Sequence, residues 1–282
     1  MTDRSACVRV PAHITGLFSA HEAADPRMAG SRGAGITLED GVSVTVRPGT
    51  EPSLRVDGQP TTIAPASTVI ERLGVTPEIT VRSAVPMGAG FGVSGAVALG
   101  VAFGCTIAYD LRMTENELVS LAHEAEVHAG TGLGDVVAQH RGGVPIRLVP
   151  GAPGHGVLDG IPVRGDIEYY SLGELSTEAI LAGDMVAINR AGEHALNALL
   201  EQPSLERLVG VSREFARESG LLPDALETII EDVEAAGGLA AMAMLGQTVF
   251  ALDRGLSDAG YDASRTAISG RGVTIEHRSN TG

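Results

Sequence analysis

The stretch PMGAGFGVSGA, residues 86–96, carries the strongest structural signal in this chain. It follows an apolar run at residues 79–85 that is typical of a strand, and it opens into an apolar run at residues 94–109 that is typical of a buried helix. Its glycines are Gly88, Gly90, Gly92 and Gly95. They permit a tight turn and a close approach to the backbone, because no Cβ intervenes. Since the first N–H groups of a helix attract anions, the stretch predicts a phosphate-binding turn.

Two other interpretations of this stretch fail on their context. Residues 90–95 satisfy the GxGxxG pattern of dinucleotide-binding oxidoreductases, and Asp110 lies roughly 20 residues further on. Asp110 leads into a second predicted helix, however, whereas that fold requires the end of a second parallel strand at this point. A serine-hydrolase elbow, GxSxG, requires glycine at the position of Ala96. Because a turn without a ligand rarely needs so many glycines, a phosphate-binding turn is the preferred interpretation.

The composition excludes several kinds of chemistry. The 282 residues include 35 Asp and Glu against 20 Lys and Arg, which gives a net charge of −15, and all of these basic residues are arginine. Without lysine there is no Walker-type phosphate loop, no Schiff-base chemistry and no Ser–Lys pair. The acidic balance disfavours nucleic acid and anionic membranes as partners. It also resembles the proteins of salt-loving microbes, which predicts that folding and activity depend on molar salt.

The chain is long enough for two domains, each with its own core. The segment PGAPGHGVLDGIPVRG, residues 150–165, is rich in glycine and proline and predicts a hinge. We therefore expect an N-terminal domain at residues 1–152 and a C-terminal domain at residues 160–282. The N-terminus lacks a signal-like apolar stretch, and the longest apolar run, about residues 96–109, is shorter than the ~20 residues that span a bilayer. These features predict a cytoplasmic protein.

Hydrophobic periodicity predicts alternating strands and helices in both halves of the chain. Thr114 and Glu117 form a capping-box pattern at the start of the second helix. Strands are expected at residues 6–10, 36–38, 42–46, 79–85, 167–171, 244–252 and 266–269. Helices are expected at residues 94–109, 114–128, 184–201, 205–219 and 223–236, with a short helix near Ser257.

A second group of candidate residues lies in AHEAEVHAGTGLGDVVAQHRGG, residues 122–143. Helical spacing places His123 and Glu126 on one face, and Asp135 follows a glycine-rich turn. Phosphoryl transfer needs one carboxylate for Mg²⁺ and another beside the attacking hydroxyl. Glu126 and Asp135 suit these roles, with Glu124 as the alternative metal ligand. Taken alone the pattern is weak, because helical glutamates usually face solvent and loop aspartates usually cap helices.

Together, these two regions resemble the GHMP kinases. Residues 86–95 match the ATP-binding motif P-x-x-x-G-[LF]-G-x-S-[AG] of that superfamily, and Asp135 and the pair Gly142-Gly143 match elements that follow it. The resemblance implies an α+β fold of two domains, a ribosomal-protein-S5-like α/β domain followed by a ferredoxin-like α+β domain. It also implies ATP and Mg²⁺ as cofactors.

The same resemblance implies roles for individual residues. The implied catalytic residues are Asp135, Ser94 and Glu126, with Ser94 and Glu126 holding the metal and Asp135 acting as a base or orienting the attacking hydroxyl. The implied ATP-binding residues are Pro86, Gly88, Ala89, Gly90, Phe91, Gly92, Val93, Ser94, Gly95 and Ala96.

The N-terminal segment resembles the first motif of the superfamily, P-G-K-x-x-L-x-G-E-H. In RVPAHITGLFSAHEAAD, residues 9–25, Pro11 and His21 match that motif. His13 replaces the family lysine, and Ser19 stands where the family has glycine. The region lines the acceptor pocket in the superfamily, so these differences bear on the acceptor.

The wider set of motifs resembles the archaeal pantoate kinases. These motifs are PAHITGLF, GSRGAG, PMGAGFGVSGA, AHEAEV, GTGLGD and MAMLGQTVFA, and they extend over about residues 9–275. MAMLG, residues 242–246, stands where other GHMP kinases have a glycine-rich third motif. The resemblance implies phosphorylation of the terminal hydroxyl of pantoate to 4-phosphopantoate in coenzyme A biosynthesis. A homodimer is a further expectation.

An acidic acceptor predicts a cationic anchor for its carboxylate. A guanidinium binds a carboxylate through two parallel hydrogen bonds, so Arg147 is the predicted anchor, with Ser19 and His123 as further donors. Taken alone, Arg147 could equally form a surface ion pair, and His123 could be a core histidine. Other acceptors, such as shikimate, homoserine or mevalonate, and a non-catalytic nucleotide-binding paralogue remain alternatives.

Overall fold

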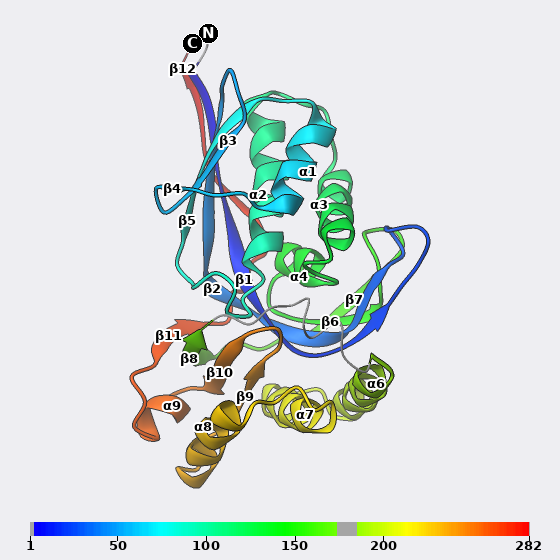
Figure 1. Ribbon diagram of the computed structural model, residues 1–282, viewed down its shortest axis with the longest axis vertical. Helices are drawn as coiled ribbons and strands as arrows, with labels where there is room; N and C mark the ends of the chain where they lie inside the picture. Colours follow the sequence, from blue (N-terminus) through cyan, green and yellow to red (C-terminus); the bar gives the residue numbers. More distant parts are fainter. Residues whose placement is uncertain (1–2, 174–184, 282) are drawn as a thin grey trace.

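The computed structural model describes residues 3–173 and 185–281, which form an α+β protein with two sheets (Figure 1). Within the described residues the larger sheet has eight strands in the order β12-β1-β2-β5-β3-β4, and β6 pairs with both β2 and β7. These strands are β1 (Asp3–His21), β2 (Gly30–Pro48), β3 (Ser53–Val56), β4 (Gln59–Pro60), β5 (Pro77–Ser83), β6 (Val144–Val149), β7 (Val157–Ile161) and β12 (Thr274–Thr281).

The hairpin of β1 and β2 contacts helices from both the first and the second half of the chain (Figure 1). Each strand has 19 residues, and their register shifts between Pro11 and Ala12 and again between Thr15 and Leu17. Such irregularities increase the local twist and bend of a strand. Residues 13–19 stay paired with β2 in the bent part of the hairpin, and there they contact the C-terminal half of the chain, for example through Thr15.

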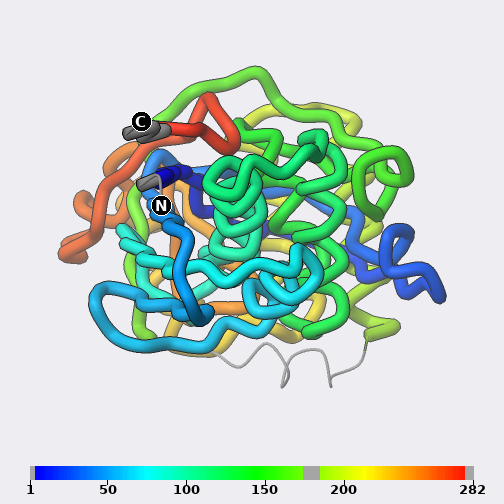
Figure 2. Tube along the Cα trace, turned by 90° about the horizontal axis from the view of Figure 1, so that it is seen from above, coloured from blue at the N-terminus to red at the C-terminus, as the bar shows by residue number. Residues whose placement is uncertain are grey.

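Helices cover one face of the larger sheet, and Figure 2 shows α1, α2 and α3 side by side. They are α1 (Ala64–Leu73), α2 (Val93–Ala108), α3 (Glu115–Ala129) and the short α4 (Asp135–Arg141). As predicted, α2 is buried on nearly all sides. Gly100 and Gly104 allow it to lie close to β2, because a Cβ at these positions would come within 2.5 Å of Val44 and Val46. The predicted capping box at the start of α3 is also confirmed.

The smaller sheet belongs to the second half of the chain. Within the described residues its strands are β8 (Asp166–Gly173), β9 (Ala240–Ala243), β10 (Gln247–Leu252) and β11 (Ser264–Ala267), in the order β11-β8-β10-β9. The accompanying helices are α6 (Met185–Glu201), α7 (Leu205–Glu218), α8 (Asp224–Ala235) and the short α9 (Gly255–Asp258). Residue 184, which opens the helix predicted at residues 184–201, lies outside the described residues. None of the described helices combines the length and hydropathy needed to cross a bilayer.

Two sequence expectations are corrected by this arrangement. The strand predicted at residues 244–252 is confirmed as β10 at residues 247–252, but residues 244–246 form the turn that separates β9 from β10. The segment at residues 150–165 is not a plain linker, since β7 lies within it and pairs with β6 of the larger sheet. The last strand, β12, also pairs with β1. The division into domains at residues 1–152 and 160–282 stays a prediction, and the larger sheet draws strands from both ranges.

The two halves are joined by close backbone contacts. The Met244 N–H donates to the Thr15 carbonyl over 2.9 Å, and the Thr248 hydroxyl donates to the Ala89 carbonyl over 2.8 Å. A Cβ at Gly246 would lie 2.0 Å from the Ala89 oxygen. The turn between β9 and β10 therefore lies directly against residues 86–92 before α2, which we call the glycine loop.

A second contact predicts a paired effect on stability. A Cβ at Gly192 in α6 would lie 1.9 Å from the Phe18 oxygen of β1, whereas a Cβ at Gly210 in α7 would meet nothing within 4 Å. Overpacking a tight contact destabilises by about 1–3 kcal/mol, so Gly192→Ala should lower the free energy of unfolding by that amount. Gly210→Ala should raise it by about 0.5–1 kcal/mol, since alanine is the better helix former. Urea denaturation of both variants checks this, and equal effects would contradict the docking of α6.

Candidate active site

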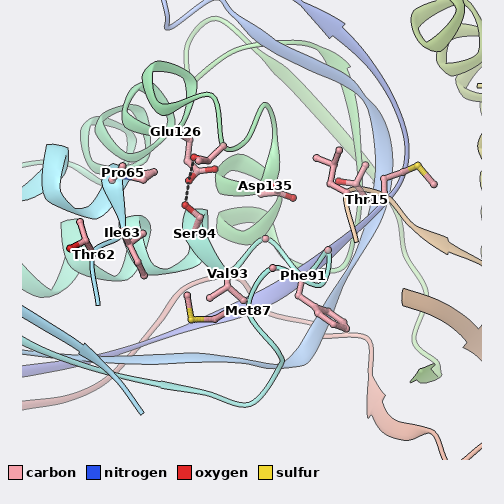
Figure 3. Close-up of a pocket in the computed structure, with 17 residues that line it drawn as sticks. Thr15, Thr62, Ile63, Pro65, Met87, Phe91, Val93, Ser94, Glu126 and Asp135 are labelled. Carbon is pink, nitrogen blue, oxygen red and sulfur yellow. Dashed lines mark hydrogen bonds between the residues drawn. The ribbon is translucent and has the colours of Figure 1, made fainter. Parts of the chain in front are cut away.

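A cavity of about 290 Å³ lies against the glycine loop, and we call it the loop cavity (Figure 3). Its walls come from β1, the start of α1, residues 87–94, α3, the start of α4 and the turn between β9 and β10. A second, smaller cavity of about 30 Å³ adjoins it and is lined by Arg147, so we call it the arginine cavity. Thr15, Asp135 and Leu245 line both cavities.

The glycine loop forms the floor of the loop cavity. Gly88, Gly90 and Gly92 have φ angles of 73°, 91° and 62°, which side chains with a Cβ rarely adopt. Gly92 is the N-cap of α2, and no described side chain caps this helix. The first N–H groups of α2 therefore have no partner within the helix, at the end where its dipole is positive. This arrangement suits a phosphate group.

The predicted loop residues divide into those that face the cavity and those that support it. Residues lining the cavity are Gly88, Gly90, Phe91, Gly92, Val93 and Ser94. Ala89 and Ala96 are buried in the core behind the loop, and Pro86 is exposed. Gly95 lies where a Cβ would come 3.1 Å from Val136, so it allows α2 to pack against α4.

Ser94 and Glu126 meet on one wall of the loop cavity (Figure 3). The Ser94 hydroxyl donates to Glu126 Oε1 over 2.6 Å, and the Thr131 hydroxyl donates to the same oxygen over 3.0 Å. Burial raises the pKa of Glu126 to about 7, although these hydrogen bonds lower it in part. Glu124, the alternative metal ligand, forms an ion pair with Arg72 over 2.8 Å and lines neither cavity.

Asp135 is held by His13, which precedes it by 122 positions in the sequence. His13 is completely buried on β1, and its Nδ1 lies 2.6 Å from Asp135 Oδ1. Burial lowers the pKa of His13, so the imidazole is neutral at neutral pH and donates its single N–H to the carboxylate. Burial alone would raise the pKa of Asp135, but the His13 hydrogen bond and the charge of Arg147 outweigh it and hold this pKa below its usual value. Asp135 is therefore an ionised, oriented acceptor.

Arg147 lies on β6 with only 2% of its surface exposed. Burial lowers its pKa to about 10, which leaves the guanidinium charged at neutral pH. Its Nε and Nη1 atoms have no hydrogen-bond partner in the described part of the chain. Buried donors of a charged group that lack hydrogen bonds are unfavourable even with the charge of Asp135 nearby, so these two atoms indicate a binding site for an anion.

The other two predicted substrate residues are held by protein groups. His123 is buried, and its Nε2 donates to the Ala29 carbonyl over 2.9 Å. The Ser19 hydroxyl donates to Glu193 of α6 over 2.6 Å, and Glu193 also pairs with Arg32. Neither residue lines the loop cavity or the arginine cavity. The structure therefore gathers Ser94, Glu126, Asp135 and Arg147, with Ser19 and His123 outside this group.

Several residues that line the loop cavity were not predicted from the sequence. They are Thr15, Thr62, Ile63, Ala64, Pro65, Met87, Thr131, Met244 and Leu245. Thr15, Thr131 and the pair Met244-Leu245 lie inside motifs that the sequence did single out. The start of α1 offered only one signal, a proline at the first turn of a helix.

Known proteins resemble this chain along most of its length. The family model for the GHMP kinases N terminal domain matches residues 62–143. The pantoate kinase of Thermococcus kodakarensis is 36% identical over 261 residues, which cover 87% of this chain and 86% of the relative. The pantoate kinase of Methanocaldococcus jannaschii is 36% identical over 255 residues, which cover 86% of this chain and 91% of the relative.

Solved structures agree with these sequence matches. A phosphotransferase related to the CoA biosynthesis pathway has a TM-score of 0.85 and 31% identity, covering 96% of this chain and 98% of its own. The structure of MDDEF in complex with MVAPP, AMPPCP and magnesium has a TM-score of 0.68 at 15% identity, covers 96% of this chain and 98% of its own, and shows a shared fold alone. The chain belongs to the pantoate kinase family of the GHMP kinases.

Proposed function

We propose that this chain transfers the γ-phosphoryl group of ATP to the terminal hydroxyl of pantoate, giving 4-phosphopantoate and ADP in coenzyme A biosynthesis. One observation carries the proposal most strongly. Asp135 lines both a cavity floored by the glycine loop and a cavity lined by Arg147, whose buried Nε and Nη1 atoms have no hydrogen-bond partner among the described residues. A phosphate site and a carboxylate site thus meet at a single ionised carboxylate.

The loop cavity suits ATP. The uncapped start of α2 provides N–H groups for the phosphates without any lysine. Ile63, Pro65 and Met87 line the same cavity and offer apolar surface to a nucleotide base. We place the triphosphate along the glycine loop with its γ-phosphorus toward Asp135.

Ser94 and Glu126 fit the requirements of Mg²⁺. Both present oxygen atoms, which this ion prefers, and they lie within 2.6 Å of each other on the cavity wall. A magnesium ion bound there neutralises charge on the phosphates of ATP. It also stabilises the ionised form of Glu126, whose burial otherwise favours protonation.

The arginine cavity suits the carboxylate of the acceptor. Its ~30 Å³ accommodates that group against Arg147, and the rest of the acid extends toward Asp135. Asp135 orients the attacking hydroxyl and takes its proton as the new O–P bond forms. We retain Ser19 and His123 as proposed substrate residues, which requires Ser19 to leave Glu193 and His123 to leave the Ala29 carbonyl.

An acceptor assay tests this function. The purified chain with ATP and Mg²⁺ should convert pantoate to a phosphorylated product that mass spectrometry identifies, and kcat/KM for pantoate should exceed the values for shikimate, homoserine and mevalonate. A higher kcat/KM for one of these other acceptors would identify that acceptor, and not pantoate, as the substrate. Nucleotide binding without turnover of any acceptor would favour the non-catalytic alternative.

The remaining expectations stay predictions. They are a homodimer, a cytoplasmic location, an archaeal source, no nucleic acid or membrane partner, and adaptation to salt. The net charge of −15 supports the last of these, because salt screens repulsion between carboxylates. Activity and melting temperature that do not change between low and molar KCl would contradict it.

The buried Glu126 predicts an unusual pH dependence of stability without metal. Its pKa rises from 4.5 to about 7 on folding, so the folded state binds more protons than the unfolded state between these pH values. Stability contributed by the protonated carboxyl is therefore present at pH 4.5 and lost as the pH rises through 7. Glu126→Gln lacks this loss and should be more stable than the wild type above pH 7, by on the order of 3 kcal/mol.

Thermal denaturation across pH 4.5–8.5 without metal checks this prediction. The advantage of Glu126→Gln should disappear near pH 4.5, and adding Mg²⁺ with ATP should raise the melting temperature of the wild type more than that of the variant. Glu124→Gln is the matched control and should show neither effect, because Glu124 lies outside both cavities. Equal behaviour of the two variants would contradict Glu126 as the metal ligand.

A further inference from the structure

Leu245 has a backbone conformation that is unusual for its side chain. Among the described residues, the non-glycine residues with positive φ are Asp57, Asp110, Leu245 and Asp253, and the φ of Leu245 is 65°. Aspartate tolerates this left-handed conformation because its short polar side chain can form local hydrogen bonds. A leucine has no such compensation, so its presence in this conformation calls for a reason outside the backbone.

The position of Leu245 supplies such a reason. It lies in the turn between β9 and β10, which docks on the glycine loop through Gly246 and on β1 through the hydrogen bond from Met244 to Thr15. Leu245 lines both the loop cavity and the arginine cavity, as do Thr15 and Asp135. It is the apolar member of this set, and its side chain also packs against the core.

The junction of the two cavities is where the chemistry takes place. In the proposed transfer, the acceptor oxygen forms a bond to the γ-phosphorus, the bond from that phosphorus to the β,γ-bridging oxygen breaks, and ADP leaves. The hydroxyl proton passes to Asp135. A water molecule at the same place breaks the same bond and yields inorganic phosphate, so the site must favour the acceptor hydroxyl over water.

We propose that Leu245 is a specificity-determining residue that excludes water from the junction of the loop cavity and the arginine cavity. This inference rests on the proposed phosphotransfer and adds a role to it. An apolar wall beside Asp135 leaves the acceptor hydroxyl, held through its carboxylate by Arg147, as the favoured nucleophile. The strained turn places this wall where a residue in an ordinary conformation would point elsewhere, which accounts for a leucine where glycine or asparagine would suit the backbone better.

Two substitutions separate this role from a structural one. Leu245→Asn suits the left-handed conformation but removes the apolar wall, whereas Leu245→Met keeps the apolar bulk and the strain. We expect Leu245→Asn to stay folded with a melting temperature close to that of the wild type, because relief of the left-handed strain offsets the packing against the core that the leucine side chain loses. The phosphate released per molecule of acid phosphorylated should nevertheless rise by about tenfold or more, because water reaches the junction. For Leu245→Met, this ratio should stay within about twofold of the wild-type value.

The measurement is the parallel determination of ADP, inorganic phosphate and phosphorylated pantoate for the wild type and each variant. Asp253→Asn is the matched control, because Asp253 has a similar φ of 54° but lines neither cavity of the site, and its ratio should be unchanged. An unchanged ratio in Leu245→Asn, with normal turnover, would overturn the inference alone. If the wild type phosphorylates no acid at all, the proposed function fails and this inference fails with it.

Discussion

Asp135→Asn should lower kcat for pantoate phosphorylation by about 10²–10⁴-fold, the range expected for loss of a general base. The KM for ATP should change little, because the proposal places the phosphates against the glycine loop and the start of α2. Asparagine keeps the size of the side chain but cannot take the proton of the acceptor hydroxyl. Steady-state kinetics with varied ATP and varied pantoate measure both quantities. A variant that retains most of its kcat would show that another group accepts the proton.

The partner of Asp135 provides the control for this prediction. Asparagine at position 13 places an amide N–H near the position of His13 Nδ1, whereas leucine removes the donor that lies 2.6 Å from Asp135. His13→Asn should therefore retain much of the activity, and His13→Leu should lose kcat with little change in the KM for ATP. Similar losses in both variants would indicate that His13 acts only by filling space beneath the site.

Arg147→Met should raise the KM for pantoate strongly and also stabilise the protein without substrate. Hydrogen bonds to charged groups contribute about 1.5–3 kcal/mol, so two of them lost from one carboxylate should lower kcat/KM for pantoate by about 10²-fold or more. The guanidinium is buried with two unpartnered donor atoms in the described chain. Replacement of a buried charge by an apolar side chain of similar volume is often stabilising, by about 1–4 kcal/mol.

Opposite changes in stability and activity distinguish an anion site from a structural arginine. Thermal denaturation without ligands should show a higher melting temperature for Arg147→Met, and added pantoate should shift the wild type but not the variant. Arg141→Met is the control variant, because Arg141 ends α4 shortly before β6 and lines neither cavity. The kcat/KM of this variant for pantoate should match that of the wild type. A destabilised Arg147→Met with an unchanged KM for pantoate would contradict the proposed anchor.

The failure to predict the turn at residues 244–246 has an identifiable cause. The run from Met244 to Leu252 is apolar apart from Gly246, Gln247 and Thr248, so the pattern favours a single strand. In the folded protein this glycine lies against the Ala89 carbonyl, and the Met244 N–H bonds to Thr15. The turn thus depends on contacts with a segment more than 150 residues away, and local pattern cannot report such contacts.

The residues of the site also differ in whether the sequence alone could predict them. Ser94 and Glu126 were predicted from a glycine-rich turn before a helix and a glutamate on the next helix, a pattern that is weak alone and that the resemblance to the GHMP kinases strengthened. The pairing of His13 with Asp135 could not, since it joins β1 to α4 across 122 positions of sequence. Ser19 was predicted as a donor to the acceptor, and only the fold showed that α6 brings Glu193 to it.

Short-range features of this protein follow from its residues alone. The glycine loop, the buried helix α2 and the capping box of α3 depend on neighbours within a few positions, where propensity and hydrogen-bond geometry decide the outcome. The residues that line the cavities could be identified only from the folded chain. Thr15, Asp135, Arg147 and Leu245 come from four separate elements, and a hydrophobic pattern indicates that a residue is buried without indicating what it faces. What a buried side chain faces is decided by how distant segments pack against one another, which is a property of the whole molecule.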